Sequence, residues 1–284
     1  MSKTIETLVE DIQEVLLNGV TEVPTEIAEE FGRNMAAILI SRMSNREDKS
    51  GLRMSNIGTP CDRKLWLQVH RNEDKEELDA STILKFFYGD LIEETLLALA
   101  KLGGHSVEGR QTELRIGGIV GHRDAVVDGV TVDVKSASSH SFGKFERGTL
   151  VDDDPFGYVD QLQSYIEAGQ SDELVTDKLR GAFLVADKVL GKITLDIHER
   201  DASRDLTKEF ERKQAMVNGY MEPARAFNPV PLGMSGNMKL PTFCSYCNVK
   251  KLCHPGLRTF LYSNGPVYLT TVKKTPEVPE VIEG

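Results

Sequence analysis

The feature that most constrains this chain is the Asp-Gly dipeptide at residues 128–129, which separates two runs of alternating apolar and polar residues. Asp-Gly favours a two-residue type I′ turn, because both turn positions need a positive φ. Such a turn pairs Val127 with Val130, and counting outward pairs Asp124 with Asp133. Directly opposed side chains have Cβ atoms about 4.5–5.5 Å apart, and like charges at that separation repel. The sequence therefore predicts a hairpin that brings two carboxylates face to face.

Strand alternation extends this prediction to neighbouring side chains. It places Lys135 on the same face as Asp133 and opposite His122. Three valines are assigned to the other face: Val126, Val132 and Val134. A patch of two acids and a lysine fits either a solvated sheet face or a divalent-cation site, because a hard cation removes the repulsion between carboxylates. The hairpin alone leaves both interpretations open.

The remaining periodicity predicts a mixed α/β (α+β) protein in which a mixed central β-sheet is flanked by helices. Helical spacing occurs at residues 4–18, 25–44, 81–101, 155–168 and 202–226. Strand-like alternation occurs at residues 107–116, 118–127, 130–137, 181–188 and 192–199. We expect four regions, which are an N-terminal helical region (1–80), a core (81–227), a cysteine-rich region (228–262) and an extended or flexible tail (263–284).

Composition limits the environment and the partners of the chain. Its 284 residues carry a formal net charge of −10, which argues against a surface that coats nucleic acid generally. A local basic groove remains compatible with that charge, since metal ions can offset acids at a site that handles phosphates. No apolar run reaches the roughly 18 residues that a membrane span needs, and the acidic N-terminus does not resemble a signal peptide. We expect a cytoplasmic protein.

Two predicted helices carry further polar residues, which would join the hairpin acids in one site if the fold buries them nearby. Gln161 and Tyr165 lie one turn apart on one helix face, a pattern that a partly buried amphipathic helix also produces. Glu93 lies in a segment that is apolar nearly all round. A carboxylate there is costly unless it is paired or bound to metal, although an ordinary solvated glutamate is the alternative.

The four cysteines predict a metal site. Cys244, Cys247 and Cys253 are spaced by two and five residues, and Cys61 lies far upstream. In a cytoplasmic protein such cysteines favour metal binding over disulfides. Zinc and an iron–sulfur cluster both accept four cysteines, and the spacing alone leans towards zinc because structural zinc is commoner. Either group would join the N-terminal lobe to the C-terminal lobe.

Basic residues around the first cysteine are candidates for contact with nucleic acid. Arg53, Arg63 and Lys64 could bind phosphates, and Trp66 could stack on a base. For Trp66, the single tryptophan of the chain, packing in the core is the more common role.

Taken together, the motifs resemble those of the PD-(D/E)XK nuclease superfamily, in its RecB-like branch. The matching motifs, in order along the chain, are Gly89-x-x-x-Glu93, Gly121-His122-Arg123-Asp124, Asp133-Val134-Lys135 and Gln161-x-x-x-Tyr165. Arg123 stands where that family often has proline, and Glu93 where the branch usually has histidine. The layout of one cysteine before this core and three after it is similar to that of the iron–sulfur exonucleases of the branch.

The resemblance implies a restriction-endonuclease-like fold and roles for individual residues. Asp124, Asp133, the Val134 carbonyl and Glu93 would bind Mg²⁺ or Mn²⁺, and Lys135 would position or activate the attacking water. Gln161 and Tyr165 would support the site and contact DNA. It also implies a structural [4Fe–4S] cluster, rather than zinc, on the four cysteines.

The function implied is that of a metal-dependent DNA exonuclease, with 5′ to 3′ digestion and a preference for single strands as family expectations. DNA would be the partner, and a homo-oligomer or a recombination or CRISPR protein is compatible. A phage DNA-processing role or CRISPR spacer processing in a prokaryotic or phage-infected cell would suit such an enzyme. The alternatives are a restriction-type endonuclease and a non-catalytic nucleic-acid-binding module with a structural Cys₄ zinc.

Overall fold

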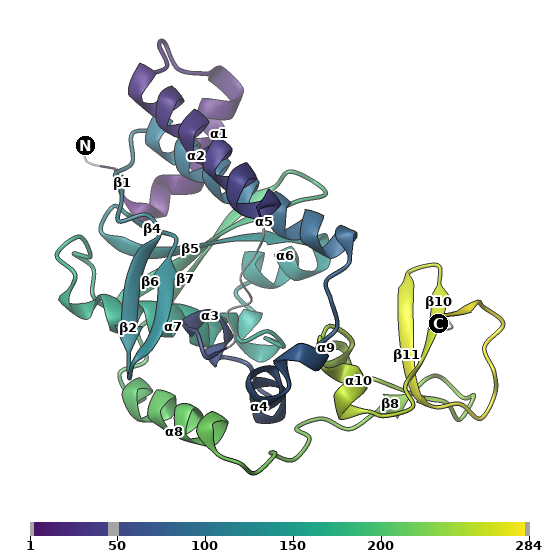
Figure 1. Ribbon diagram of the computed structural model, residues 1–284. Helices are drawn as coiled ribbons and strands as arrows, with labels where there is room; N and C mark the ends of the chain where they lie inside the picture. Colours follow the sequence, from purple (N-terminus) through teal and green to yellow (C-terminus); the bar gives the residue numbers. More distant parts are fainter. Residues whose placement is uncertain (1–2, 45–50, 282–284) are drawn as a thin grey trace.

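The computed structural model describes residues 3–44 and 51–281 and has a mixed α/β architecture, as the sequence predicts (Figure 1). Its central sheet has the strand order β1-β4-β5-β6-β7. Strands β5 and β6 run parallel, whereas the other neighbours pair in antiparallel fashion. Strands β2 and β3 form a separate two-stranded sheet, and a second five-stranded sheet has the order β12-β10-β11-β9-β8.

The strands follow the alternating segments closely in the first two sheets. The strands of the central sheet are β1 (Val107–Glu108), β4 (Ala125–Val127), β5 (Val130–Ala137), β6 (Arg180–Asp187) and β7 (Ile193–Glu199). The two-stranded sheet contains β2 (Thr112–Ile116) and β3 (Ile119–Arg123). The C-terminal sheet contains β8 (Val230–Pro231), β9 (Met238–Lys239), β10 (Arg258–Tyr262), β11 (Gly265–Thr271) and β12 (Glu280–Val281).

Helices form in all five predicted helical segments and in the cysteine regions, and a further helix forms at residues 139–146, where none was predicted. The longer helices are α1 (Leu8–Asn18), α2 (Thr25–Met43), α4 (Asp62–His70), α5 (Ala80–Leu102), α6 (Ser139–Glu146), α7 (Tyr158–Ala168) and α8 (Leu206–Asn218). The short helices are α3 (Met54–Ile57), α9 (Thr242–Ser245) and α10 (Lys250–Cys253).

Local capping explains where two of these helices start. Helix α5 begins after Asp79, whose side chain accepts the Thr82 N–H, so it starts one residue before the predicted segment. Helix α8 is shorter than the predicted 202–226 because Asp205 caps its start by accepting the Lys208 N–H. The helix then ends before Gly219, which has extended backbone angles.

The Asp-Gly turn has the predicted geometry. Asp128 and Gly129 have φ angles of 49° and 80°, and the ladder pairs Val127 with Val130 and Ala125 with Val132. Val126 pairs with Thr131 and therefore shares the face of Asp133, so its assignment to the opposite face is wrong.

The predicted pairing of the hairpin strands does not continue to the residues before Asp124. Strand β3 pairs with β2 in its own sheet, where His122 lies opposite Glu113 and is exposed. The expected pairing of His122 with Lys135 is therefore wrong, because the chain passes from one sheet to another between Arg123 and Asp124.

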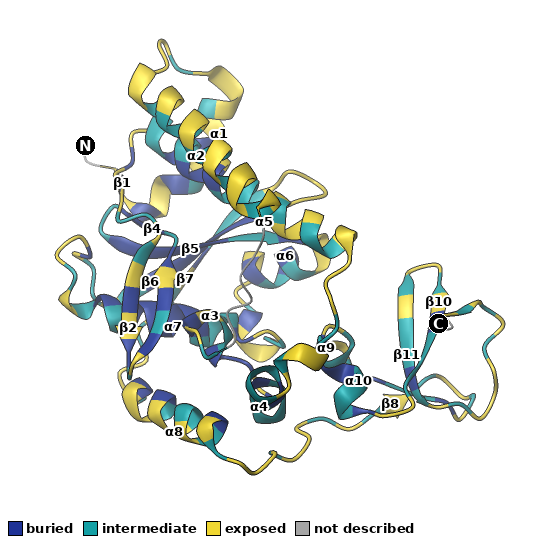
Figure 2. Cartoon of the chain, in the orientation of Figure 1, coloured by how far each residue is buried: buried dark blue, intermediate teal, exposed yellow. Residues whose placement is uncertain are grey.

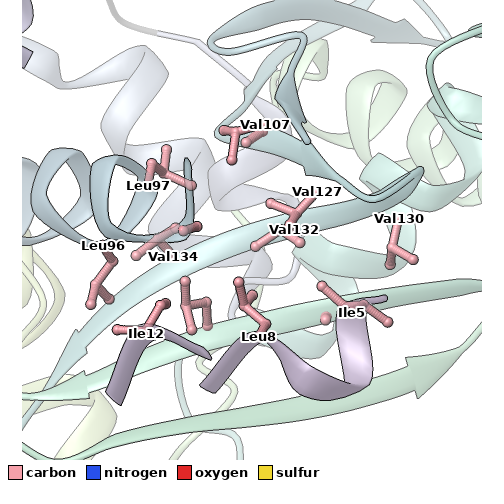
Figure 3. Close-up of a cluster of buried hydrophobic side chains, with 14 of the residues drawn as sticks. Ile5, Leu8, Ile12, Leu96, Leu97, Val107, Val127, Val130, Val132 and Val134 are labelled. Carbon is pink, nitrogen blue, oxygen red and sulfur yellow. The ribbon is translucent and has the colours of Figure 1, made fainter. Parts of the chain in front are cut away.

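One face of the central sheet packs on α1 and α5. This buried cluster, shown in Figure 3, contains Leu8 and Ile12 of α1, Leu97 of α5, and alternate residues of β5 such as Val132 and Val134. Since these side chains are almost fully removed from water, they contribute much of the hydrophobic stabilisation of the sheet. The N-terminal helix α1 therefore packs directly on the core.

The opposite face of the sheet packs on α6 and α7. Phe142 and Phe145 of α6 and Leu162 and Ile166 of α7 surround Phe183 of β6. The sheet is consequently the middle of three layers, and alternate side chains of each strand enter different layers. Figure 2 shows its strands mostly buried between the helices.

The C-terminal sheet contradicts the prediction of a tail over 263–284. Residues 265–271 form β11, which pairs with β10, and residues 280–281 form β12 on the other side of β10. Residues 282–284 lie outside the described part. Figure 1 shows this sheet, in yellow, beside the central body, with α9 and α10 between them.

A close approach of two glycines holds α3 against α7. A Cβ at Gly58 or at Gly157 would overlap the carbonyl oxygen of the other residue, and Gly157 has a φ of 72°. Gly157 also precedes the first residue of α7, the helix that carries Gln161 and Tyr165. This contact thus ties the segment before Cys61 to the helix behind the carboxylates.

We expect Gly157→Ala to destabilise the protein more than Gly118→Ala. Both sites have positive φ, which costs an L-residue about 1–2 kcal/mol, but Gly118 has open space where a Cβ would stand. The overlap at Gly157 should add about 1–3 kcal/mol. Urea unfolding of the two variants measures the difference, and equal losses would show that the glycine contact has no energetic weight.

Candidate active site

Asp133 and Asp124 meet where β4 begins beside β5. Asp133 points from β5 towards the α7 layer and is only 1% exposed. Asp124 precedes β4, and its Oδ2 accepts the Val134 N–H at 2.8 Å. The Asp124 side chain therefore binds the backbone of β5 just beyond the last residue pair of the β4–β5 ladder. The two acids are close enough for Asp133 to raise the pKa of Asp124.

Glu93 reaches the same place from α5. Its Oε1 accepts a hydrogen bond of 2.8 Å from Gln111 Nε2, which also lies 3.5 Å from Asp124 Oδ1. The neighbouring Glu94 is the more deeply buried of the two, and it pairs with Arg110 and accepts from Asn34 Nδ2 at 3.1 Å. Glu94 is thereby satisfied within the fold, whereas Glu93 faces the acids.

The three carboxylates share an excess of negative charge. Burial, with added repulsion from Asp133, raises the pKa of Glu93 to about 7. Burial and the charges of Asp133 and Glu93 raise the pKa of Asp124 well above its ordinary value. Two buried acids that resist ionisation beside a third indicate a site where a proton or a cation must offset the charge.

Lys135 supplies part of that positive charge. Its Nζ lies 2.6 Å from Asp133 Oδ2 and 3.3 Å from Gln161 Oε1. Burial alone would lower the pKa of Lys135, but the carboxylates of Asp133 and Asp124 raise it above its ordinary value. Lys135 is therefore an ammonium group at neutral pH.

Helix α7 completes the site with a hydrogen-bonded pair. Gln161 Nε2 lies 3.2 Å from both Asp133 Oδ1 and the Tyr165 hydroxyl. Burial and the charge of Asp133 raise the pKa of Tyr165 to about 12, so its hydroxyl stays neutral. The structure thus brings together one or two polar residues from each of the four sequence motifs, whereas His122 of the second motif is exposed on β3.

The donor atoms fit a hard divalent cation in kind. Mg²⁺ and Mn²⁺ take oxygen ligands, and carboxylates are the oxygen donors gathered here. Asp133 Oδ2 is buried and accepts no well-aligned hydrogen bond from the described residues, although Lys135 Nζ is close. Within residues 3–44 and 51–281, however, no three His, Cys, Asp or Glu side chains converge tightly enough to form a ready metal site. Ligation would need these side chains to move closer.

The four cysteines are neighbours in space. Cys61 precedes α4, whereas Cys244 belongs to α9 and Cys253 to α10. Burial and the nearby thiols of Cys247, Cys61 and Cys253 raise the pKa of Cys244 to about 12. The thiols are close enough to affect one another electrostatically, yet they too fall short of a converged group in the part of the chain that is described.

The predicted phosphate-binding residues have separate surroundings. Arg53 is exposed at the start of α3. Arg63 pairs with Glu222 and donates to the Pro223 carbonyl at 3.0 Å, so it holds α4 against the segment after α8. Lys64 Nζ lies 4.9 Å from the centroid of the Phe243 ring. Their contact with DNA stays a prediction.

Trp66 has the structural role that is common for tryptophan. Its Nε1 donates to the Gly219 carbonyl at 2.7 Å, and its ring stacks on His70 at 4.2 Å between centroids. The hydrogen bond holds α4 to the end of α8, whereas the stack lies within α4, so a role in stacking on a base has no support here.

Sequence reasoning missed three residues of this region. Gln111 bridges Glu93 and Asp124 from a turn with a φ of 50°, and periodicity carries no signal for it. Arg123 is fully buried and pairs with Asp172 at 2.7 Å, which anchors the chain next to Asp124. Tyr158, whose ring lies 4.9 Å from Lys135 Nζ, precedes Gln161 by three residues, and that helical spacing could have identified it.

Comparisons with known proteins add little to this description. No family model matches the chain, and no curated protein matches it. One solved structure, titled "Crystal structure of SSO0001", is similar over 80% of this chain and 96% of that chain, with 16% identity and a TM-score of 0.43. That likeness is too weak to bear on fold or function. Among the described residues, no helix has the length and apolar character needed to cross a bilayer.

We expect Glu93→Gln to stabilise the metal-free protein at pH 8. The folded-state pKa of about 7 exceeds the ordinary 4.5, so ionising Glu93 costs folding free energy as pH rises through that window. In EDTA, the free energy of unfolding of the wild type should contain a falling component between pH 5 and pH 8 that the variant lacks, worth about 2 kcal/mol. Parallel pH profiles for the two proteins would contradict this assignment.

Proposed function

We propose that this chain is a metal-dependent deoxyribonuclease of the exonuclease type, built on a restriction-endonuclease-like core. The observation that carries the proposal is the gathering of Glu93, Asp124 and Asp133 beside Lys135. Their excess negative charge, expressed in the raised pKa values of Glu93 and Asp124, favours binding of a divalent cation. The resemblance of the motif order to PD-(D/E)XK nucleases supports the same chemistry.

The residues that would hold Mg²⁺ or Mn²⁺ are the three carboxylates and the Val134 carbonyl. When bound, such a cation supplies Lewis-acid stabilisation of charge on a phosphodiester. The Asp124 side chain also binds the Val134 N–H, so it is fixed relative to the strand that bears Asp133. This contact would limit the movement needed for ligation to small shifts of side chains.

Lys135 and α7 would act on the substrate side. An ammonium group donates hydrogen bonds and cannot accept a proton, so Lys135 would orient the attacking water or a phosphate oxygen and would not serve as a base. Gln161 contacts both Lys135 and Asp133 and would keep the lysine in line with the acids. Tyr165 would hold the amide of Gln161 in that orientation. Water would then attack phosphorus as one phosphorus–oxygen ester bond breaks.

The four cysteines would hold a structural [4Fe–4S] cluster that joins the N-terminal and C-terminal lobes. Their shared neighbourhood supports this, since each of the other three thiols raises the pKa of Cys244. Four thiolates suit the cluster, and metal binding would remove the protons that burial now favours. Gln68 Nε2 of α4 also donates to Asn248 Oδ1 at 2.8 Å, so the two segments are already joined next to the thiols.

We expect Asp133→Asn to reduce hydrolysis of DNA by at least about a hundredfold in Mg²⁺ or Mn²⁺. The matched control is Asp152→Asn, an exposed acid outside the carboxylate site, which should keep full activity. Single- and double-stranded substrates labelled at the 5′ or the 3′ end would also give strand preference and polarity. A wild-type protein that binds DNA but never cuts it would instead support a non-catalytic binding module, and cuts inside circular DNA would support an endonuclease.

We expect anaerobically purified protein to be brown, with a broad visible absorption band that Cys247→Ser removes. Cys247 is buried among Leu67 and Val249, so a serine there fits in size but is a poor ligand for iron. Iron and zinc contents should be measured on the same samples. A colourless protein with stoichiometric zinc would contradict the cluster and leave the nuclease proposal standing.

A further inference from the structure

A row of aromatic rings leads from the carboxylate site to the surface near the cysteines. The Tyr158 ring, beside Lys135, lies 5.6 Å from the Phe156 ring, which lies 5.9 Å from the Tyr246 ring. At its inner end the row is fixed in the core, since Tyr158 lies 6.3 Å from Phe145. The rings therefore form a fixed series with one end at the lysine of the site.

The outer two rings are open to solvent. Phe156 is 38% exposed and Tyr246 is 73% exposed, although large aromatic side chains bury strongly when they serve only the core. The rings of Phe156 and Tyr246 meet edge to face at 66°, which leaves ring surface free on both. Exposed ring faces next to a candidate site for phosphate chemistry suggest a surface on which bases stack.

The row continues into a cleft. Tyr246 lines a cavity of about 860 Å³ between the start of α5 and the C-terminal sheet. The cavity is also lined by Tyr268, by lysines that include Lys85 and Lys239, and by the acids Glu76, Glu77 and Asp79. A strand that leaves the carboxylate site along the rings would thus enter a hollow whose walls carry aromatic rings and charges of both signs.

Acidic neighbours of the rings are mostly engaged. Asp153 pairs with Lys144, and Asp154 accepts the N–H groups of Gly157 and Val159 at the start of α7. These acids lie before Phe156 in sequence and would repel phosphates, so the rings are suited to bind base faces with the phosphates turned away.

We propose that Phe156 and Tyr246 form a stacking platform for unpaired bases of single-stranded DNA that extends from the carboxylate site. The inference rests on the proposed function, since it names the strand on which that site would act. Bases in a duplex are stacked on their neighbours, so only an unpaired strand offers a face to each ring. A single strand would lie with its scissile phosphate by Lys135 and its neighbouring bases on the two rings.

The test is equilibrium binding of a fluorescent oligo(dT) to the purified holoprotein in EDTA, which prevents cleavage. Phe156→Ala and Tyr246→Ala should each weaken binding about tenfold, and the double variant about a hundredfold. Because stacking is non-ionic, the loss should be similar at low and high salt. Tyr246→Phe, which keeps the ring between Cys244 and Cys247, should bind as the wild type does.

Tyr220→Ala is the matched control, because Tyr220 is 96% exposed and lies two residues after the end of α8. It should leave binding unchanged. The inference is overturned if the wild type fails to bind the single strand, binds duplex equally well, or is unaffected by the alanine variants. If the wild type cleaves DNA but the alanine variants bind the single strand as tightly as it does, the stacking platform is overturned and the nuclease proposal stands. If the alanine variants lose binding but the wild type never cleaves DNA, the nuclease proposal is overturned and the platform stands.

Discussion

The mutual repulsion of Glu93, Asp124 and Asp133 is the interaction on which the account of this protein depends. Burial makes the repulsion strong, and it raises the pKa of Glu93 to about 7 and that of Asp124 well above its usual range. The rest of the fold holds the acids in place despite this cost. Such an arrangement is unfavourable for stability and is typical of a site that binds a cation or moves protons.

The three-layer architecture explains how acids from distant segments come together. Helix α5 covers one face of the sheet and contributes Glu93, whereas α7 covers the other face and contributes Gln161. They can share a site because β4 is short and leaves the edge of β5 open beside Asp133. The close contact of Gly58 with Gly157 then brings the segment before Cys61 against α7, so the cysteine region and the carboxylate site lie on adjoining parts of the molecule.

Local chemistry made the hairpin predictable and the order of the motifs identified Glu93, Gln161 and Tyr165, whereas contacts that depend on the long-range path of the chain were not predictable. The turn at 128–129 depends on two residues with positive φ, so its register followed from the sequence. The predicted pairing of His122 with Lys135 is wrong because the chain changes sheets at Arg123. The buried guanidinium of Arg123 pairs with Asp172, a residue far along the chain. Gln111 contacts Glu93 from the turn before β2, the strand that pairs with β3 outside the central sheet. Strand β11 lies in the predicted tail, and it forms because β10 is available to pair with it.

Calorimetric titration of Mn²⁺ into the cation-free protein at neutral pH tests the central claim most directly. Binding should be accompanied by release of a proton, because burial and repulsion raise the pKa of Glu93 to about 7 and a cation at this site would displace the proton that Glu93 holds. Repeating the titration in buffers of different ionisation enthalpy measures that release, and Asp133→Asn should weaken binding at least about tenfold. A wild type that binds no Mn²⁺, or binds it with the same affinity and proton release as Asp133→Asn, would contradict the account.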